Sequence, residues 1–149
     1  LKDYNSAIEI DSTENNFYFS RINLFIKTGN YNKAEEDIHK MQLASPNDPD
    51  SYYKLAYIQQ KKGNPYAAWE QISFAINNMK NYSEEYFILD IDGNLVELSD
   101  LYLFRAQTQK EIGNNSGLCN DLKIALELIK NSDSEKIPEI NKLLNDYCD

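Results

Sequence analysis

Two glycines, Gly29 and Gly63, stand 34 residues apart, and the residues around each of them follow the same order. In both places an apolar stripe at helical spacing comes first, then Gly-Asn, and then a second apolar stripe. A unit of this length cannot bury its apolar face by itself, so successive units must stack on one another. The spacing therefore predicts an all-α chain of helix-turn-helix units stacked into a solenoid.

The apolar positions divide the chain into repeating units. In the first complete unit, residues 15–48, they are Tyr18, Ile22, Phe25, Ala34, Ile38 and Met41. In the second unit, residues 49–82, they are Tyr52, Leu55, Ala56, Ala68, Ile72 and Ala75. Because Gly113 follows Gly63 by 50 residues, which is one period plus 16, an insert at 83–98 separates the second unit from the third, residues 99–132. That third unit carries Tyr102, Arg105, Ala106, Leu118, Leu122, Ala125 and Leu128.

The two ends of the chain differ from the units between them. Residues 1–14 match only the latter half of a unit, so we expect a truncated unit there. Residues 133–149 hold apolar residues at i, i+3, i+4 and i+7, which predicts an amphipathic capping helix with Ile140, Leu143, Leu144 and Tyr147 on its apolar face. We therefore expect one domain over residues 1–149, of about three and a half units.

The insert contains two short apolar runs on either side of a turn that begins at Asp90 and includes Gly93. Such runs around Asp-x-Asp-Gly-Asn predict a short β-hairpin. The alternative is a calcium loop with oxygen ligands in alternation. An EF-hand loop, however, needs glycine where Leu95 stands and a bidentate glutamate where Leu101 stands. The hairpin is therefore the preferred interpretation.

The register of aromatic, glycine and alanine positions resembles the tetratricopeptide repeat family over about residues 1–130, with the opening aromatic place filled by Tyr18, Tyr52 and Tyr102. The last unit, with Gly117-Leu-Cys-Asn-Asp and the terminal Tyr147-Cys148, looks like the closing segment of repeat proteins common in Bacteroidetes-type bacteria. The resemblance implies a non-catalytic scaffold for protein–protein interaction. The alternative function is a structural spacer, or a self-association module that uses the open N-terminal face, within a longer multidomain protein.

Family geometry also implies that the first helix of each unit lines a concave face. The exposed side of these helices would then carry Asn16, Phe19, Asn23 and Lys27, then Asp50, Tyr53, Tyr57 and Lys61, and then Asp100, Leu103, Gln107 and Lys110. From these we predict a groove for a peptide partner, lined by Phe19, Asn23, Lys27, Tyr53, Tyr57, Lys61, Leu103, Gln107 and Lys110, since aromatic side chains anchor interfaces. The alternative is that these side chains simply pack between adjacent units.

Some family members hold a partner's C-terminal carboxylate with a clamp of cations on this face. The lysines expected on the face here are interleaved with Asp50, Asp100 and Glu111, so we do not expect such a clamp. Arg21 and Arg105 occupy equivalent helical positions, and we expect each to pair with a carboxylate inside the stack.

The two cysteines, Cys119 and Cys148, lie near the start of one predicted helix and at the end of an antiparallel one. A disulfide between them would close a loop that stabilises the chain by roughly 3.5 kcal/mol in the chain-entropy model. It would also imply an oxidising, periplasmic or secreted location. The alternative is two separate thiols, one of them buried at the position that Trp69 fills in the preceding unit.

Composition limits the remaining function classes. The net charge of −9 argues against binding to nucleic acid or to an anionic membrane surface, and gives a weak preference for basic peptide partners. No apolar run approaches the ~18 residues that span a bilayer. Two cysteines and the single His39, expected on the surface, make no metal site, and we expect no cofactor. No phosphate loop or nucleophile elbow occurs, so we expect no enzyme, with a carboxylate pair formed across space as the one catalytic alternative left open.

Overall fold

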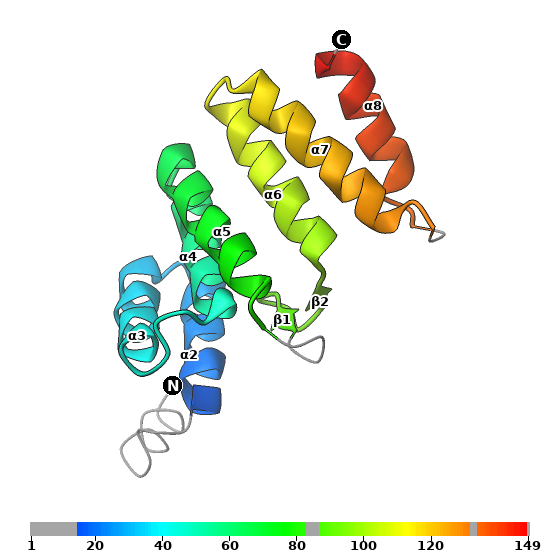
Figure 1. Cartoon of the computed structure of the whole chain (residues 1–149). Coiled ribbons are helices and arrows are strands. Elements are labelled where there is room, and N and C mark those ends of the chain that lie inside the picture. The colour runs from blue at the N-terminus through cyan, green and yellow to red at the C-terminus, as the bar shows by residue number, and fades with distance from the viewer. Residues whose placement is uncertain (1–14, 83–86, 132–133, 149) are drawn as a thin grey trace.

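The computed structural model describes residues 15–82, 87–131 and 134–148, and its helices follow one another as a stack of antiparallel pairs (Figure 1). The elements are α2 (Asn15–Lys27), α3 (Tyr31–Ala44), α4 (Pro49–Lys61), α5 (Pro65–Met79), β1 (Ile88–Leu89), β2 (Leu95–Val96), α6 (Leu98–Glu111), α7 (Asn115–Ile129) and α8 (Ile137–Tyr147). The predicted helical solenoid, hairpin insert and C-terminal capping helix are all confirmed. The truncated unit expected at residues 1–14 lies outside the described residues.

The repeated glycines end the first helix of each unit in the same way. Their φ angles are 73°, 75° and 76° at Gly29, Gly63 and Gly113, a left-handed conformation that costs glycine little. In every case the backbone amide of the next asparagine donates to the carbonyl five residues earlier, at 2.8 to 2.9 Å. The 34-residue spacing is thus the interval between two successive turns of the same kind. Each turn reverses the chain, so that the second helix of the unit packs against the first.

Buried apolar side chains form two clusters along the solenoid. The N-terminal cluster joins α2, α3 and α4 and contains Ile22, Phe25, Ile26, Ala34, Ile38, Met41, Leu55 and Ile58. The C-terminal cluster joins α4 to α8 with the hairpin and includes Ile72, Ile76, Ile88, Val96, Leu101, Leu122, Ile129 and Ile140. One assignment was wrong: Leu128 is exposed and its neighbour Ile129 is buried, because α7 turns Ile129 toward the helices it packs on.

The insert forms the predicted antiparallel hairpin, with Ile88 opposite Val96 and Leu89 opposite Leu95. Ile88 and Val96 are buried in the C-terminal cluster, whereas Leu89 and Leu95 on the opposite side of the strands are exposed. Asp90 builds the turn, because its Oδ1 accepts the backbone N–H groups of residues 92 and 94, each at 2.8 Å. This carboxylate therefore serves the turn in the way expected of a hairpin.

Helix α8 closes the C-terminal end by packing along α7 (Figure 1). Pro138 lies in the first turn of α8, where a missing backbone N–H costs nothing. The side chain of Ile140, two residues further along, is almost completely buried. Leu143 and Leu144 pack with Ile140 against the C-terminal cluster, so this part of the predicted stripe is the face by which α8 covers the last repeated unit. Placing Tyr147 on the buried face was wrong, because its side chain is exposed at the end of the helix.

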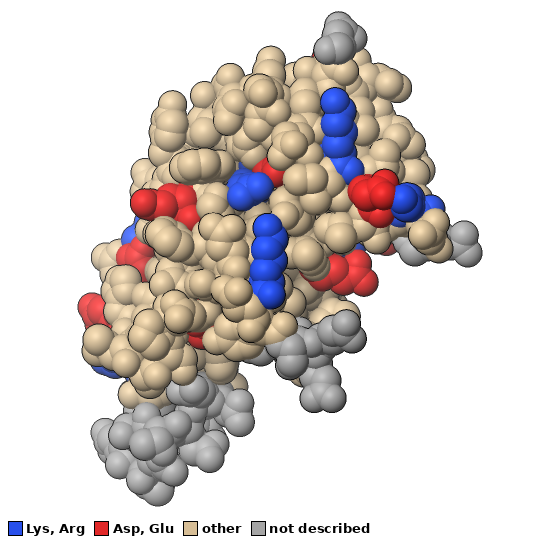
Figure 2. Space-filling model, in the orientation of Figure 1, with Lys and Arg blue, Asp and Glu red and all other residues tan. Residues whose placement is uncertain are grey.

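The surface of the solenoid carries charges of both signs. On the face shown in Figure 2, blue and red side chains are scattered over a mostly uncharged surface, in places next to one another, and no basic patch is visible there. Within the described part of the chain, none of the helices combines the length and apolar character needed to cross a bilayer.

Candidate functional site

The first helices of the three units, α2, α4 and α6, form the side of the solenoid that we call the first-helix face. Lys54 of α4 lies over the ring of Phe19 of α2, and Tyr53 of α4 contacts Phe104 of α6.

The hairpin lies against this face. The Nζ of Lys54 on α4 donates to the backbone carbonyl of Leu89 in β1 at 3.0 Å. At the tip of the hairpin, Asp92 pairs with Lys27 on α2 at 3.0 Å. The insert therefore reaches back over the two preceding units and divides the first-helix face.

Lys54 is the side chain that fastens the hairpin, and it is only 1% exposed. Its ammonium donates to Asp50 Oδ1 at 2.8 Å and lies 5.7 Å from the ring centroid of Phe19. The expectation that Asp50 is exposed was wrong, because the hairpin covers this part of α4 and the carboxylate is buried as the partner of Lys54. Burial raises the pKa of Asp50, although the neighbouring ammonium of Lys54 acts in the opposite direction.

A cavity of about 550 Å³ lies on the N-terminal side of the hairpin, and we call it the N-terminal cavity. Phe19 and Asn23 of α2 form one wall of it, and Phe87 and Leu89 of the hairpin form another. Phe87 is 60% exposed, and Leu89 is also exposed. Among the described residues, the Oδ1 of Asn23 is the one buried side-chain oxygen or nitrogen without a hydrogen-bond partner. The lining also contains Ser20, Ser45, Asp48, Asp50, Lys54 and Tyr82. The cavity thus combines apolar side chains with polar and charged ones.

A second cavity, of about 420 Å³, lies on the other side of the hairpin, and we call it the hairpin cavity. It is lined by Tyr53, Asp90, Leu95, Val96, Asp100, Phe104 and Lys136. The rings of Tyr53 and Phe104 meet edge to face with centroids 6.2 Å apart. Burial raises the pKa of the Tyr53 hydroxyl, and the carboxylates of Asp90, Asp50 and Asp100 raise it further, in that order. The hydroxyl therefore lies in a region of negative potential.

Three other predicted partner-binding residues border α8. Leu103, Gln107 and Lys110 of α6 line a cavity of about 230 Å³ whose opposite wall includes Ile140 and Leu143 of α8. The ammonium of Lys110 lies 4.6 Å from the ring centroid of Tyr147, also on α8. The C-terminal part of the first-helix face is thus bordered by the capping helix, with Gln107 still exposed.

The remaining pair of predicted residues lies near the end of α4. Tyr57 is partly buried against the N-terminal cluster, and the ammonium of Lys61 lies 5.2 Å from its ring centroid. The nine predicted residues therefore do not line one continuous cavity: the structure brings Phe19 and Asn23 together, sets Tyr53 across the hairpin from them, and places the α6 residues beside α8. The exposed hairpin residues Phe87 and Leu89 were not among the predicted site residues, although their alternation with Ile88 is a signal that could have found them.

The two arginines make the predicted ion pairs inside the stack. Arg21 donates to both carboxylate oxygens of Asp37, each at 2.7 Å. Arg105 does the same with Asp121, at 2.8 and 2.7 Å. Both aspartates are buried, so these bidentate pairs join the first and second helices of a unit.

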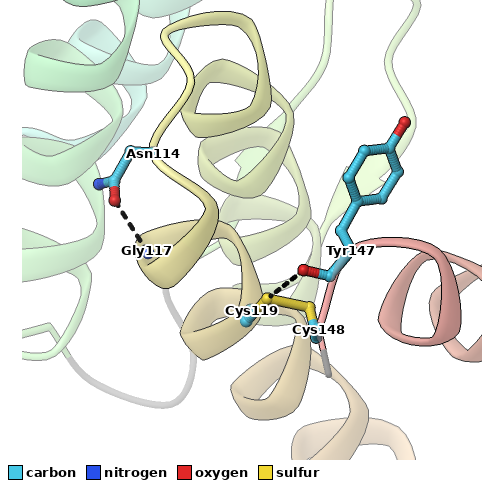
Figure 3. The surroundings of a disulfide bond; sticks show 5 residues. All are labelled: Asn114, Gly117, Cys119, Tyr147 and Cys148. Carbon is cyan, nitrogen blue, oxygen red and sulfur yellow. Dashed lines mark hydrogen bonds between the residues drawn. A yellow bond between two sulfur atoms is a disulfide. The ribbon is translucent and has the colours of Figure 1, made fainter.

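The predicted disulfide between Cys119 and Cys148 is present, with a Cα–Cα distance of 5.6 Å (Figure 3). It joins the first turns of α7 to the end of α8, and the backbone carbonyl of Tyr147 lies 3.4 Å from the Sγ of Cys119. The alternative of two separate thiols was wrong. The equivalent residue of the preceding unit, Trp69, is itself partly exposed rather than buried.

Metal-binding groups do not gather anywhere in the described residues: no set of three His, Cys, Asp or Glu side chains is placed to hold a metal ion. His39 is exposed, as predicted, and its Nδ1 lies 3.2 Å from the Oε1 of Gln42. The site chemistry that the described residues offer is therefore that of cavities, aromatic rings and carboxylates.

No protein-family model matches the chain, and no curated protein matches it in sequence. Solved structures do match it. The chain is similar to the Yersinia enterocolitica type III secretion chaperone SycD, seen in complex with a peptide of the translocator YopD, with a TM-score of 0.72 and 16% identity over 93% of this chain and 95% of that one.

It is also similar to the first tetratricopeptide domain of Spaghetti (RPAP3) bound to the HSP90 peptide SRMEEVD, with a TM-score of 0.67 and 18% identity over 93% of this chain and 97% of that one. At these identities the likeness concerns the fold. Together with the repeated glycine turns, the comparisons show that this chain has the tetratricopeptide-like helical repeat fold.

Proposed function

We propose that this chain is a non-catalytic protein-interaction scaffold that binds an extended peptide segment on its first-helix face, with the N-terminal cavity as the main contact. The observation that carries the proposal is the cavity of about 550 Å³ between α2 and the hairpin. Its size lies within the range of pockets that enclose a ligand or a partner's side chain.

The lining of the N-terminal cavity suits a peptide. Phe19, Phe87 and Leu89 offer apolar and aromatic contact to a partner's side chain. The amide of Asn23 on the same wall offers a hydrogen bond to a peptide backbone, since its Oδ1 has no partner among the described residues. Apolar burial with one backbone hydrogen bond is a common way to hold an extended segment.

The rest of the predicted groove extends this contact. Tyr53, Tyr57 and Lys61 on α4 and Lys27 on α2 would contact the segment beyond the cavity. Leu103, Gln107 and Lys110 would do so only at their exposed edges, because α8 lies beside them. The proposal thus gives most of the binding energy to the N-terminal half of the first-helix face.

Both similar structures contain a peptide, one from YopD and one with the acidic sequence SRMEEVD, which supports peptide binding as the use of this fold. The lysines of α2 and α4 on the first-helix face do not converge on one point, as a clamp for an acidic tail would require. Lys27 pairs with Asp92, Lys54 is buried with Asp50, and Lys61 lies over Tyr57. With a net charge of −9, we therefore propose a neutral or basic segment as the partner.

The disulfide supports a place of action outside reducing compartments. Structural disulfides persist in oxidising environments such as the periplasm or the extracellular medium. We propose that the chain works there, and mass measurement of the natively purified protein with and without reductant tests the bridge.

The experiment that tests the proposed function is selection of random peptides displayed on phage, followed by affinity measurement with variants. Phe19→Ala is expected to weaken a selected peptide about tenfold, as loss of an aromatic anchor does. Asn23→Ala should weaken it less. The matched control is Tyr66→Ala, an exposed aromatic on α5 that does not line the cavity.

Selected peptides that respond to Tyr66→Ala and not to Phe19→Ala would refute binding at the N-terminal cavity. Failure to select any peptide, together with a concentration-dependent dimer in sedimentation, would instead support the spacer or self-association function.

A further inference from the structure

We infer that the hairpin cavity is a receptor for the basic side chain, lysine or arginine, of a partner peptide. This inference rests on the proposed function and names a feature of the partner's sequence. The cavity lies between α4, the hairpin and α6, on the opposite side of the hairpin from the N-terminal cavity.

The walls of the hairpin cavity suit the hydrocarbon part of such a side chain. Tyr53 and Phe104 meet edge to face, and Leu95 and Val96 of β2 lie beside them. A lysine stem of four methylene groups can pack along these rings while its ammonium remains near polar groups. Aromatic faces also attract cations directly, because their electron density is concentrated above the ring.

The charges of the cavity favour a cation over an anion. Asp90 and Asp100 line it, and Glu97 lies next to it at the start of α6. The one cation that lines it among the described residues is Lys136. Asp90 accepts its hydrogen bonds from amide groups of residues 92 and 94, and no ion pair joins it to a described cation. The described side chains at the cavity therefore leave a surplus of negative charge.

Lys136 shows how an ammonium is held at this site. Its Nζ lies 2.7 Å from Asp100 Oδ1 and 3.7 Å from Glu97 Oε2, at the edge of the cavity. The pKa of Lys136 is raised by these carboxylates against the opposing effect of its partial burial. A second cation would lie between Asp90 and the rings, a position that no described cation occupies.

The acidity of the whole chain acts in the same direction. A net charge of −9 draws basic segments toward the molecule and repels acidic ones. A partner with an apolar residue for the N-terminal cavity and a basic residue for the hairpin cavity would therefore bridge the hairpin.

The inference is tested by nuclear magnetic resonance titration with two probes, N-acetyl-lysine methylamide and N-acetyl-norleucine methylamide, which share a four-carbon side chain and differ by the ammonium of lysine. The lysine probe is expected to shift the ring resonances of Tyr53 and Phe104 saturably, and the norleucine probe to shift them much less. Asp90→Asn keeps the acceptor oxygen of the turn but removes its charge, and should weaken lysine binding about threefold. Lys136→Met removes the competing ammonium and should strengthen it by a similar factor.

These two variants change affinity in opposite directions, which damage to the fold would not do. The control Glu70→Gln, an exposed residue of α5, removes one negative charge away from the cavity and should leave affinity nearly unchanged. Equal shifts with both probes, no saturable shift of Tyr53 or Phe104, or weaker lysine binding in Lys136→Met would each overturn the inference.

Failure of this inference can be separated from failure of the proposed function. If selected peptides still depend on Phe19 while the lysine probe does not bind, only the basic-residue receptor is wrong. If the lysine probe binds as expected while Phe19→Ala does not change the affinity of selected peptides, the assignment of the N-terminal cavity as the main contact is wrong.

Discussion

The first and third units hold their helices together with a buried arginine–aspartate pair, whereas the middle unit does not. Arg21–Asp37 and Arg105–Asp121 occupy the same positions of their units. The equivalent residues of the middle unit are Leu55, which is buried, and Gln71. The same helix pair thus forms with or without an ion pair at these positions, so the ion pair does not determine the fold. It makes each outer unit sensitive to the loss of either partner.

The outer units differ in how they are covered. The third is followed by α8, which the disulfide ties to α7, and it shares the larger buried cluster with the hairpin. Among the described residues, the first unit shares only the smaller cluster with α4. We therefore expect the C-terminal half to be the more stable one.

The largest effect is expected from Asp121→Ala. It would leave the guanidinium of Arg105 without its partner and remove an acceptor from the buried Gln109, at a cost of about 3 kcal/mol. Asp37→Ala should cost less, because no buried side-chain amide of the described residues donates to Asp37. Urea unfolding of both variants checks this order, and a smaller loss for Asp121→Ala would contradict it.

Replacing the ion pair of the third unit by the two residues that the middle unit has at these positions sharpens the same comparison. The double variant Arg105→Leu/Asp121→Gln removes both charges together, so neither is left buried and unpaired. We expect it to recover most of the stability that Asp121→Ala loses. Its free energy of unfolding should lie within about 1.5 kcal/mol of the wild-type value. A double variant as unstable as the single one would show that the fold of the third unit requires the ion pair.

Removing the disulfide should bring the stability of the two ends closer together. Cys119→Ser/Cys148→Ser opens a loop with a sequence separation of 29. We expect a loss of about 2 to 3 kcal/mol, which is below the roughly 3.5 kcal/mol of the chain-entropy model because the unfolded chain without the bridge retains some structure. Thermal unfolding with and without reductant checks this. Reductant should lower the Tm of the wild type and leave that of the double serine variant unchanged.

The smallest effect concerns Tyr53, between the two halves. Its pKa is raised in the folded state above the ordinary value of 10.0, so the unfolded chain loses this proton first as pH rises. The free energy of unfolding of the wild type should therefore decrease above pH 10, by up to about 1.4 kcal/mol per pH unit. Tyr53→Phe has no hydroxyl at this position and should lack this part of the decrease. Parallel stability curves for the two proteins between pH 9 and 11 would contradict the burial of this hydroxyl.

Features set by local order were predictable from the sequence. The glycine spacing predicted the helix pairs, the two apolar runs that flank the turn at Asp90 predicted the hairpin, and the equivalent positions of Arg21 and Arg105 predicted their ion pairs. The antiparallel ends gave the disulfide. Each of these depends on residues close together or on a repeated register, which a sequence displays directly.

The features that shape the candidate site were not predictable in this way. Nothing in the period of α4 shows that Lys54 is buried or that Asp50 is covered, because the hairpin that covers them comes from an insert outside the repeat. The same holds for α8 beside Leu103 and Gln107. The sequence pattern of a helix shows which of its faces is apolar. It does not show which distant segment of the chain packs on a given face, because that depends on the tertiary structure.

The most direct test of peptide binding on the first-helix face is measurement of intermolecular nuclear Overhauser effects between the labelled chain and a selected peptide. The account predicts contacts from the peptide to the rings of Phe19 and Phe87 and to the methyl groups of Leu89. Contacts confined to Tyr66, Trp69 and Phe74 of α5 would place the peptide on the opposite side of the solenoid and contradict it.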